Sequence, residues 1–244
     1  MQFIQILPFI TTLVTFVFAA LVFRRYAQRG GLHSLIWGIG LTMYGIGTLA
    51  EAVLAVSYSP FVLHSWYLFG AILTPAWLGQ GTVHLLVRRK NVANTLLVIL
   101  TIATVIAAVK IYSLPTNDAL YKIGVPVSSQ YRDVMPRDTF TAVLLSVFAL
   151  YGTVTLVGGA LYSAYIFLRK RIMPQRVLGN VLIAIGGLSP ALGGTLAARG
   201  LGDYLFVSEL IGAVLIFIGF RLATTQQPIA APSAAQTPQT NPSA

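Results

Sequence analysis

Seven long apolar stretches dominate the 244-residue chain. A transmembrane helix needs about 20 mostly apolar residues, because each residue advances the helix by about 1.5 Å. Seven windows meet this requirement, at residues 4–23, 32–57, 61–87, 93–113, 139–168, 177–198 and 204–222. The sequence therefore predicts an all-α polytopic membrane protein, with residues 1–222 forming one seven-helix transmembrane domain.

The composition is typical of a protein that lies in a lipid bilayer. Hydrophobic residues make up 56% of the chain and charged residues only 9%, whereas soluble domains carry about 25% charged residues. The net charge of +10 does not indicate a nucleic-acid partner, because the basic residues form short clusters between apolar stretches and not one basic face. The absence of cysteine excludes disulfides and thiolate metal ligands.

The basic residues also predict the orientation, since lysine and arginine gather on the cytoplasmic side of membrane proteins. One side of the predicted bundle carries eleven of them: Arg24, Arg25, Arg29, Arg88, Arg89, Lys90, Arg169, Lys170, Arg171, Arg176 and Arg221. The other side carries five: Lys110, Lys122, Arg132, Arg137 and Arg199. We expect a multi-pass protein of the cell (inner or plasma) membrane, with its N-terminus outside and its C-terminus in the cytoplasm.

Two longer polar segments lie outside the apolar windows. Residues 114–138 form a predicted outer loop that contains three prolines, and residues 223–244 form an uncharged tail rich in Gln, Pro, Ala, Ser and Thr. The tail has little that could pack, so we expect a disordered cytoplasmic tail. The first apolar window has no basic segment before it, which favours a retained helix over a signal peptide.

An internal repeat emerges when the chain is aligned with itself. Residues 24–50 align without gaps to residues 171–197, with 11 identities in 27 positions. Chance matches in apolar sequence are the alternative, but a shared Gly-Thr-Leu-Ala and a shared Arg-x₃-Gln-Arg favour a true repeat. The expected arrangement is a parallel 3+1+3 bundle: repeat 1 at about 4–87, a linker helix at 93–113 and repeat 2 at about 139–222.

Two carboxylates lie inside apolar windows, Glu51 and Glu209. An ionisable residue inside a membrane costs roughly 2.5–3.5 kcal/mol on insertion scales, so each is a candidate site. Both lie near the outer ends of their helices, and adjacent carboxylates would share a proton or hold a cation. The alternative is that each pairs locally, for example with Arg199, or hydrogen-bonds the backbone while protonated.

The third apolar window carries a stripe of aromatic, polar and small residues at helical spacing: Tyr67, Gly70, Thr74, Trp77, Gly81 and His84. Its glycines are typical of close helix packing. Its aromatic residues and His84 could instead line an axial cavity, with Gln80 on an adjacent face and a kink at Pro75 that helps to open the cavity.

Motifs of enzymes and metal proteins are missing from the sequence. There is no G-x-S-x-G, no H-E-x-x-H and no phosphate-binding glycine loop. A haem between His33 and His84 is conceivable, but histidines at a membrane interface more often bond water or headgroups. We therefore expect a protein that is not an enzyme, with no cofactor, no metal and no catalytic residues.

The predicted layout resembles that of SWEET sugar transporters, although only one half carries their Pro-Gln pair, at Pro174-Gln175. It also resembles the seven-helix sensor regions of histidine kinases. Segments such as Tyr67–Ala71 and Trp77–Thr82 are similar to segments of uncharacterised bacterial seven-helix membrane proteins. A retinal protein would need a lysine in the seventh helix, which this chain lacks.

These observations favour a receptor-like or sensor module that binds a small or lipidic ligand from the outer side. Its expected partners are the bilayer and a cytoplasmic signalling protein or larger membrane complex, with the outer loop as a possible lid. The expected ligand-binding residues are Glu51, Glu209, Tyr67, Trp77, Gln80 and His84. A small-solute or proton-coupled transporter and an accessory subunit of a larger complex are the alternatives.

Overall fold

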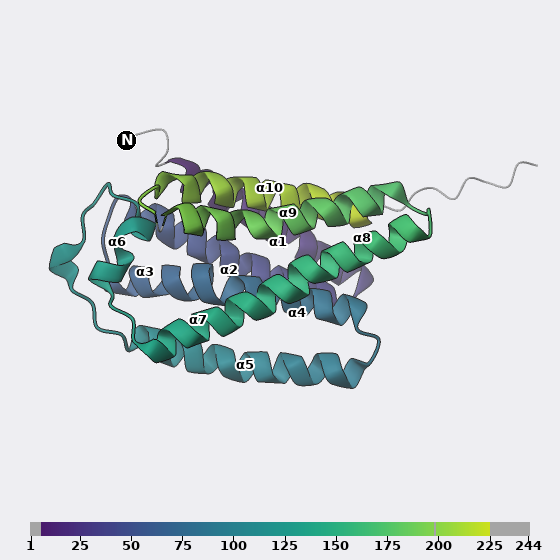
Figure 1. Cartoon of the computed structure of the whole chain (residues 1–244), viewed down its shortest axis with the longest axis horizontal. Helices are drawn as coiled ribbons and strands as arrows, with labels where there is room; N and C mark the ends of the chain where they lie inside the picture. The colour runs from purple at the N-terminus through teal and green to yellow at the C-terminus, as the bar shows by residue number, and fades with distance from the viewer. Residues whose placement is uncertain (1–5, 198, 225–244) are drawn as a thin grey trace, which may run out of the picture.

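The computed structural model describes residues 6–197 and 199–224. Within these residues it is a bundle of helices without strands (Figure 1). The elements are α1 (Leu7–Arg29), α2 (Leu32–Leu54), α3 (Pro60–Ser65), η2 (Trp66–Leu73), α4 (Thr74–Leu86), α5 (Lys90–Tyr112), η3 (Asp118–Leu120), α6 (Val127–Val134), α7 (Thr139–Gly152), η4 (Thr153–Gly158), α8 (Gly159–Arg169), α9 (Pro174–Ala197) and α10 (Asp203–Thr224).

Seven helical spans in the described residues are long and apolar enough to cross a membrane, which confirms the seven predicted windows. The third span joins α3, η2 and α4, and the fifth joins α7, η4 and α8. The sequence predicts that the C-terminal tail begins at residue 223. In the structure α10 continues through Ala223 and Thr224. The rest of that tail, residues 225–244, lies outside the described residues.

The long helices run up and down, so their connections gather at two ends of the bundle (Figure 1). The end at which α6 lies is called the α6 end. At the opposite end α1, α4, α8 and α10 terminate, and the arginine and lysine clusters between them lie there. This end is called the basic end.

Glycine allows the closest helix contacts. A Cβ atom added to Gly47 in α2 would lie 2.7 Å from the Gly70 Cα in η2, so the two backbones touch. Gly186 in α9 and Gly212 in α10 meet in the same way, since a Cβ on either would lie 2.8 Å from the other's carbonyl oxygen. Small residues at such points let membrane helices approach closely.

The span formed by α7, η4 and α8 crosses the bundle diagonally (Figure 1). Towards the basic end, η4 and α8 pack on α9, whereas at the α6 end α7 packs on α4, η2 and α5. The fifth and sixth spans therefore diverge from each other towards the α6 end.

The predicted outer loop contains structure that the sequence did not reveal, namely η3 and the two-turn helix α6. Gln130 in α6 holds the preceding turn, since its Oε1 accepts from the Lys122 N–H and its Nε2 donates to the Lys122 and Val125 carbonyls. Tyr121 donates to the Leu54 carbonyl at 2.6 Å. The segment is thus fastened to the bundle through defined polar contacts.

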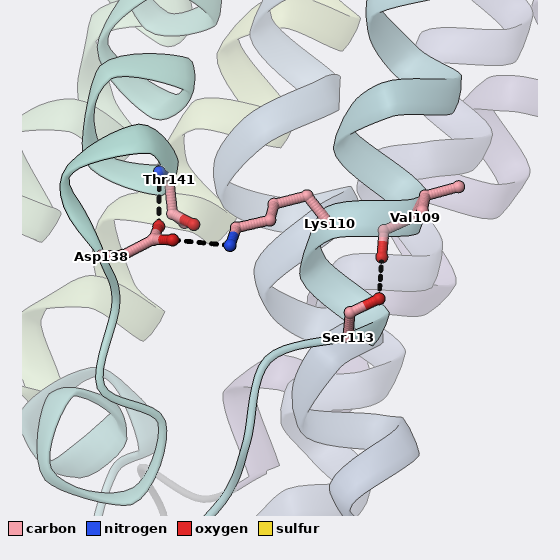
Figure 2. A network of polar contacts seen from close by, with 5 residues as sticks. All are labelled: Val109, Lys110, Ser113, Asp138 and Thr141. Carbon is pink, nitrogen blue, oxygen red and sulfur yellow. Dashed lines mark hydrogen bonds and ion pairs between the residues drawn. The ribbon is translucent and has the colours of Figure 1, made fainter.

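An ion pair joins the two helices on either side of this segment. Figure 2 shows Lys110 Nζ of α5 lying 2.5 Å from Asp138 Oδ2. Asp138 also caps α7, because its Oδ1 accepts from the Thr141 N–H at 2.9 Å. These contacts hold the pKa of the Asp138 carboxyl well below its usual value, with the bond to Lys110 as the largest cause.

Candidate ligand cavity

A cavity of about 410 Å³ lies inside the bundle. Its wall is formed by residues of α2, η2, α4, α6, α7, η4, α9 and α10. Ligand pockets in proteins commonly have volumes of about 300–1,000 Å³. The cavity therefore has the size of a site for a small molecule or for part of a lipid.

The structure brings the two membrane carboxyl groups together at this cavity. Glu209 of α10 lines the wall, and Glu51 of α2 lies behind it, close enough for the two groups to interact. Glu51 is 1% exposed. Neither Glu51 oxygen has a well-formed hydrogen bond, and neither does Oε2 of Glu209.

Tyr44 joins the two helices that carry these carboxyl groups. Its hydroxyl, on α2, donates to the Glu209 main-chain carbonyl of α10 at 2.8 Å. Tyr44 is itself buried and lines the cavity. The bond ties the main chain of α10 at Glu209 to α2.

Three aromatic rings form a cluster in the wall near the α6 end. Trp66 and Tyr67 of η2 lie 5.3 and 5.6 Å from the ring of Tyr131 in α6, and 6.2 Å from each other. All three line the cavity. The Trp66 indole also lies beside the Glu51 carboxyl group, so the rings and the carboxyl pair form one continuous region.

The cavity is open at the side of the bundle. Thr153 of η4 and Ala191 and Gly194 of α9 line it and are also exposed on the molecular surface. They border the region in which α7 diverges from α9 (Figure 1). These three positions belong to the fifth and sixth membrane-spanning helices.

Helix α6 contributes to the cavity wall at its own end. Ser128 and Arg132 of α6 line the wall, and the buried Ser128 hydroxyl has no hydrogen-bond partner. The exposed Arg132 guanidinium lies over the Tyr131 ring, 5.7 Å from its centroid. Arg137 donates to the Tyr67 hydroxyl at 3.3 Å. The basic groups here are therefore at the rim, whereas the carboxyl group is inside.

The other predicted site residues of helix 3 lie elsewhere. Trp77 Nε1 donates to Thr104 Oγ1 of α5 at 3.0 Å. Gln80 is fully buried, donates to the Ala93 carbonyl at 3.0 Å and accepts a hydrogen bond from the Tyr151 hydroxyl. None of the cavity-lining positions is Trp77, Gln80 or His84.

His84 belongs to the same group of contacts. Its Nδ1 lies 3.0 Å from Gln80 Nε2, and its Nε2 lies 3.3 Å from Asn94 Oδ1. Together, Gln80, His84, Asn94 and Tyr151 join α4, α5 and α7 and are called the Gln80 network. The hydrogen-bonding groups of the buried Gln80 side chain are satisfied by partners on neighbouring helices. This indicates a structural role for the network.

A π-helical segment explains why one predicted stripe splits into two groups. Pro75 has no N–H to bond the preceding turn, and the chain widens to a π-helix over η2. Both the N–H and the hydroxyl of Thr74 bond the Phe69 carbonyl five residues earlier. The wider turn rotates Tyr67 and Gly70 relative to Trp77, so these two residues line the cavity while Trp77 bonds Thr104 of α5; Thr74, the first residue of α4, also lines the cavity.

The sequence did not predict four residues of the cavity wall: Tyr44, Trp66, Tyr131 and Ser128.

Comparison of the chain with protein-family models, with curated proteins and with solved structures finds no match in any of the three. In the described part of the chain no group of three or more His, Cys, Asp or Glu side chains is placed to hold a metal ion. The cavity must therefore be interpreted from its own chemistry.

Proposed function

We propose that this protein is a receptor-like membrane module that binds a lipidic ligand in the cavity between its helices. The observation that carries the proposal is the cavity of about 410 Å³ with the half-buried Glu209 in its wall and an opening between α7 and α9. A ligand dissolved in the bilayer could enter there without crossing an aqueous phase.

The orientation that fits this proposal has the α6 end outside the cell and the basic end in the cytoplasm. Lysine and arginine clusters are typical of cytoplasmic turns, and the basic end carries most of them. A ligand in the cavity would contact α2, α9 and α10 at once. A signalling partner at the basic end would then respond to shifts of these helices.

Two glycine substitutions test the proposal. A Cβ at Gly194, in the cavity wall, meets open space, and so does a Cβ at Gly158, on the exposed surface of η4. Gly194→Phe should fill the cavity, whereas Gly158→Phe should add the same side chain outside it. The probe is decanol carrying a diazirine, whose photochemical labelling of the purified protein is mapped by mass spectrometry.

Wild type and Gly158→Phe should show labelling of cavity-wall peptides that excess decanol suppresses. Gly194→Phe should lose this saturable labelling and keep the background on lipid-facing helices such as α5. Labelling confined to lipid-facing surfaces in all three proteins, with no competition by decanol, would refute a binding cavity.

The unpartnered carboxyl pair favours a second function, proton-coupled transport of the same ligand, because intramembrane carboxyl groups often carry protons in transporters. Proteoliposomes with an internal pH indicator would separate the two functions. A transporter predicts a pH change inside the vesicles after addition of decyltrimethylammonium, abolished by Glu209→Gln. A receptor predicts binding of the same compound without a sustained change of pH inside the vesicles.

A further inference from the structure

We infer that the ligand of the cavity is an amphiphilic organic cation whose headgroup lies against Glu209 and the ring cluster of Trp66, Tyr67 and Tyr131, and whose binding releases one proton from the Glu51–Glu209 pair. This inference rests on the proposed function and names the class of ligand. Its chemistry follows from three features of the cavity wall.

The first feature is that the Glu51–Glu209 pair has no positively charged partner among the described residues. Glu51 and Oε2 of Glu209 are buried without hydrogen-bond partners. Among the described residues, no lysine or arginine contributes to the electrostatic surroundings of either carboxyl group. An ionised carboxylate in such a place is very costly, so burial favours the protonated form of the pair when no ligand is bound.

The second feature is the ring cluster. A cation over an aromatic face within about 6 Å is attracted by the ring quadrupole, and clusters of such rings recognise quaternary ammonium groups. Trp66, Tyr67 and Tyr131 have centroids 5.3–6.2 Å apart and all line the cavity beside Glu209. The rings and the carboxyl group would thus meet the same cation from two sides.

The third feature is a polar side chain in the same cavity wall, Ser128 of α6. The Ser128 hydroxyl is 9% exposed, has no partner and lines the cavity. It can accept or donate one hydrogen bond to a ligand headgroup. The rest of the wall at the basic side, including Leu78, Leu156 and Ile216, is apolar and suits an alkyl or ring portion.

The remaining titratable groups around the pair do not supply the missing charge. Tyr44 faces it from α2, and Tyr121 from the segment before α6; both are neutral phenols at pH 7. From α6, Arg132 is exposed and its guanidinium lies over Tyr131. Helix α9 contributes glycine, alanine and proline to the wall and no titratable side chain.

The arrangement also favours a cation over an anion. A fatty acid would need a guanidinium inside the cavity, but Arg137 is engaged with the Tyr67 hydroxyl and Arg132 lies at the rim. A carboxylate ligand would in addition face Glu209. Basic groups outside and a carboxyl group inside are the order expected for a cationic headgroup.

The proton balance is simple. The protonated Glu209 carboxyl group loses its O–H proton to water as the fixed positive charge of the ligand arrives, leaving a carboxylate paired with the cation. No bond to the ligand forms or breaks. Glu51 keeps its proton and donates a hydrogen bond to the Glu209 carboxylate, so Glu51 is a positioning residue. One cation enters and one proton leaves.

The experiment uses three probes with the same ten-carbon chain: decyltrimethylammonium, decanol and decanoate. Decyltrimethylammonium has no titratable proton, so every proton released on its binding comes from the protein. Calorimetry of the full chain in detergent, in two buffers with different ionisation enthalpies, gives both the affinity and the number of protons released.

Wild type should bind decyltrimethylammonium with release of about one proton, and its affinity should rise about tenfold per pH unit while the pair is protonated. Decanol should bind with no proton release. Glu209→Gln should weaken the binding of the cation by at least about tenfold and leave decanol binding unchanged, which also shows that the variant is folded. Asp203→Asn, which removes an exposed carboxyl group from the same helix, should behave like wild type.

Tighter binding of decanoate than of decyltrimethylammonium would overturn the inference while leaving the cavity as a binding site. So would binding of the cation without proton release. If none of the three probes binds saturably, the proposed function itself fails.

Discussion

The carboxyl pair at the cavity and the Gln80 network are both buried polar groups in an apolar bundle, and they differ in how their hydrogen bonds are satisfied. Gln80 uses its amide to bond the Ala93 carbonyl and accept from Tyr151. Glu51, just as buried, has two oxygens without a partner. Buried polar groups usually stabilise a fold only when they are satisfied.

This difference separates a structural cluster from a candidate site. The Gln80 network connects three helices through its hydrogen bonds, whereas the carboxyl pair lies at a cavity. Unpaired buried groups are costly, and natural proteins retain such cost mostly at functional sites. Substitutions with nearly isosteric methionine test this distinction directly.

The largest effect is expected for Gln80→Met. The substitution would leave the Ala93 carbonyl and the Tyr151 hydroxyl without their partner, and each unsatisfied buried group costs about 1–3 kcal/mol. We expect a loss of about 2–4 kcal/mol in the free energy of unfolding. Thermal unfolding in detergent, followed by tryptophan fluorescence, measures it. An unchanged melting temperature would remove the structural role of the network.

A smaller loss is expected for Gly47→Ala. The added Cβ would lie 2.7 Å from the Gly70 Cα, and overpacking of this kind costs about 1–3 kcal/mol. Gly194→Ala is the matched control in the same cavity wall, because its Cβ meets open space. Equal melting temperatures for both variants would mean that α2 and η2 are not in close contact.

Glu51→Met should act in the opposite direction to Gln80→Met. Replacing a buried, unpaired carboxyl group with an apolar side chain of similar size removes a desolvation cost. We expect the free energy of unfolding to rise by about 1 kcal/mol, seen as a higher melting temperature. If Glu51→Met instead lowers the melting temperature as Gln80→Met does, the two clusters have the same role.

The smallest effect is expected at the exposed Lys110–Asp138 pair, since surface ion pairs contribute little. The pKa of Asp138 is lowered in the folded protein, so its contribution is fully present above its ordinary pKa of 3.8 and disappears as the pH falls below that value. Wild type should therefore lose melting temperature in acid, and Asp138→Asn should lose less. Parallel curves for both proteins would contradict this assignment.

The fold was largely predictable because apolar length is a local property. Each of the seven spans is visible as a window of sequence, independent of its neighbours. The two carboxylates were recognisable as a candidate site for the same reason, since a charged residue is conspicuous in an apolar window. Their mutual contact depended on the placement of α2 and α10, which no local pattern encodes.

The rest of the wall was hidden for two physical reasons. Tyr44 and Trp66 are residue types common in membrane helices. They become candidate ligand contacts only because they line the cavity. Tyr131 lies in α6, whose eight residues have the sequence of a polar loop flanked by Pro126 and Pro136. The grouping of Tyr67 with Trp77 assumed a regular helical period, which the π-helix of η2 interrupts.

The internal repeat stays a prediction. Glycines at aligned positions of its two halves make different helix contacts. Gly47 contacts Gly70, whereas Gly194, at the position equivalent to Gly47, meets open space. Gly212, equivalent to Gly70, packs on Gly186 instead. The two predicted halves therefore use similar sequence for different helix contacts, although Gly47 and Gly194 both line the cavity.

The π-helical segment η2 has a consequence for how such a protein diversifies. A π-turn accommodates one more residue than an α-turn, so its gain or loss corresponds to a single-codon insertion or deletion. Deleting one residue between Trp66 and Leu73 would rotate the aromatic residues relative to α4 by about 100°. Different side chains of η2 would then line the cavity, while α4 kept its contacts with α5. Length variation at this point in related sequences would mark a change of ligand without a change of fold.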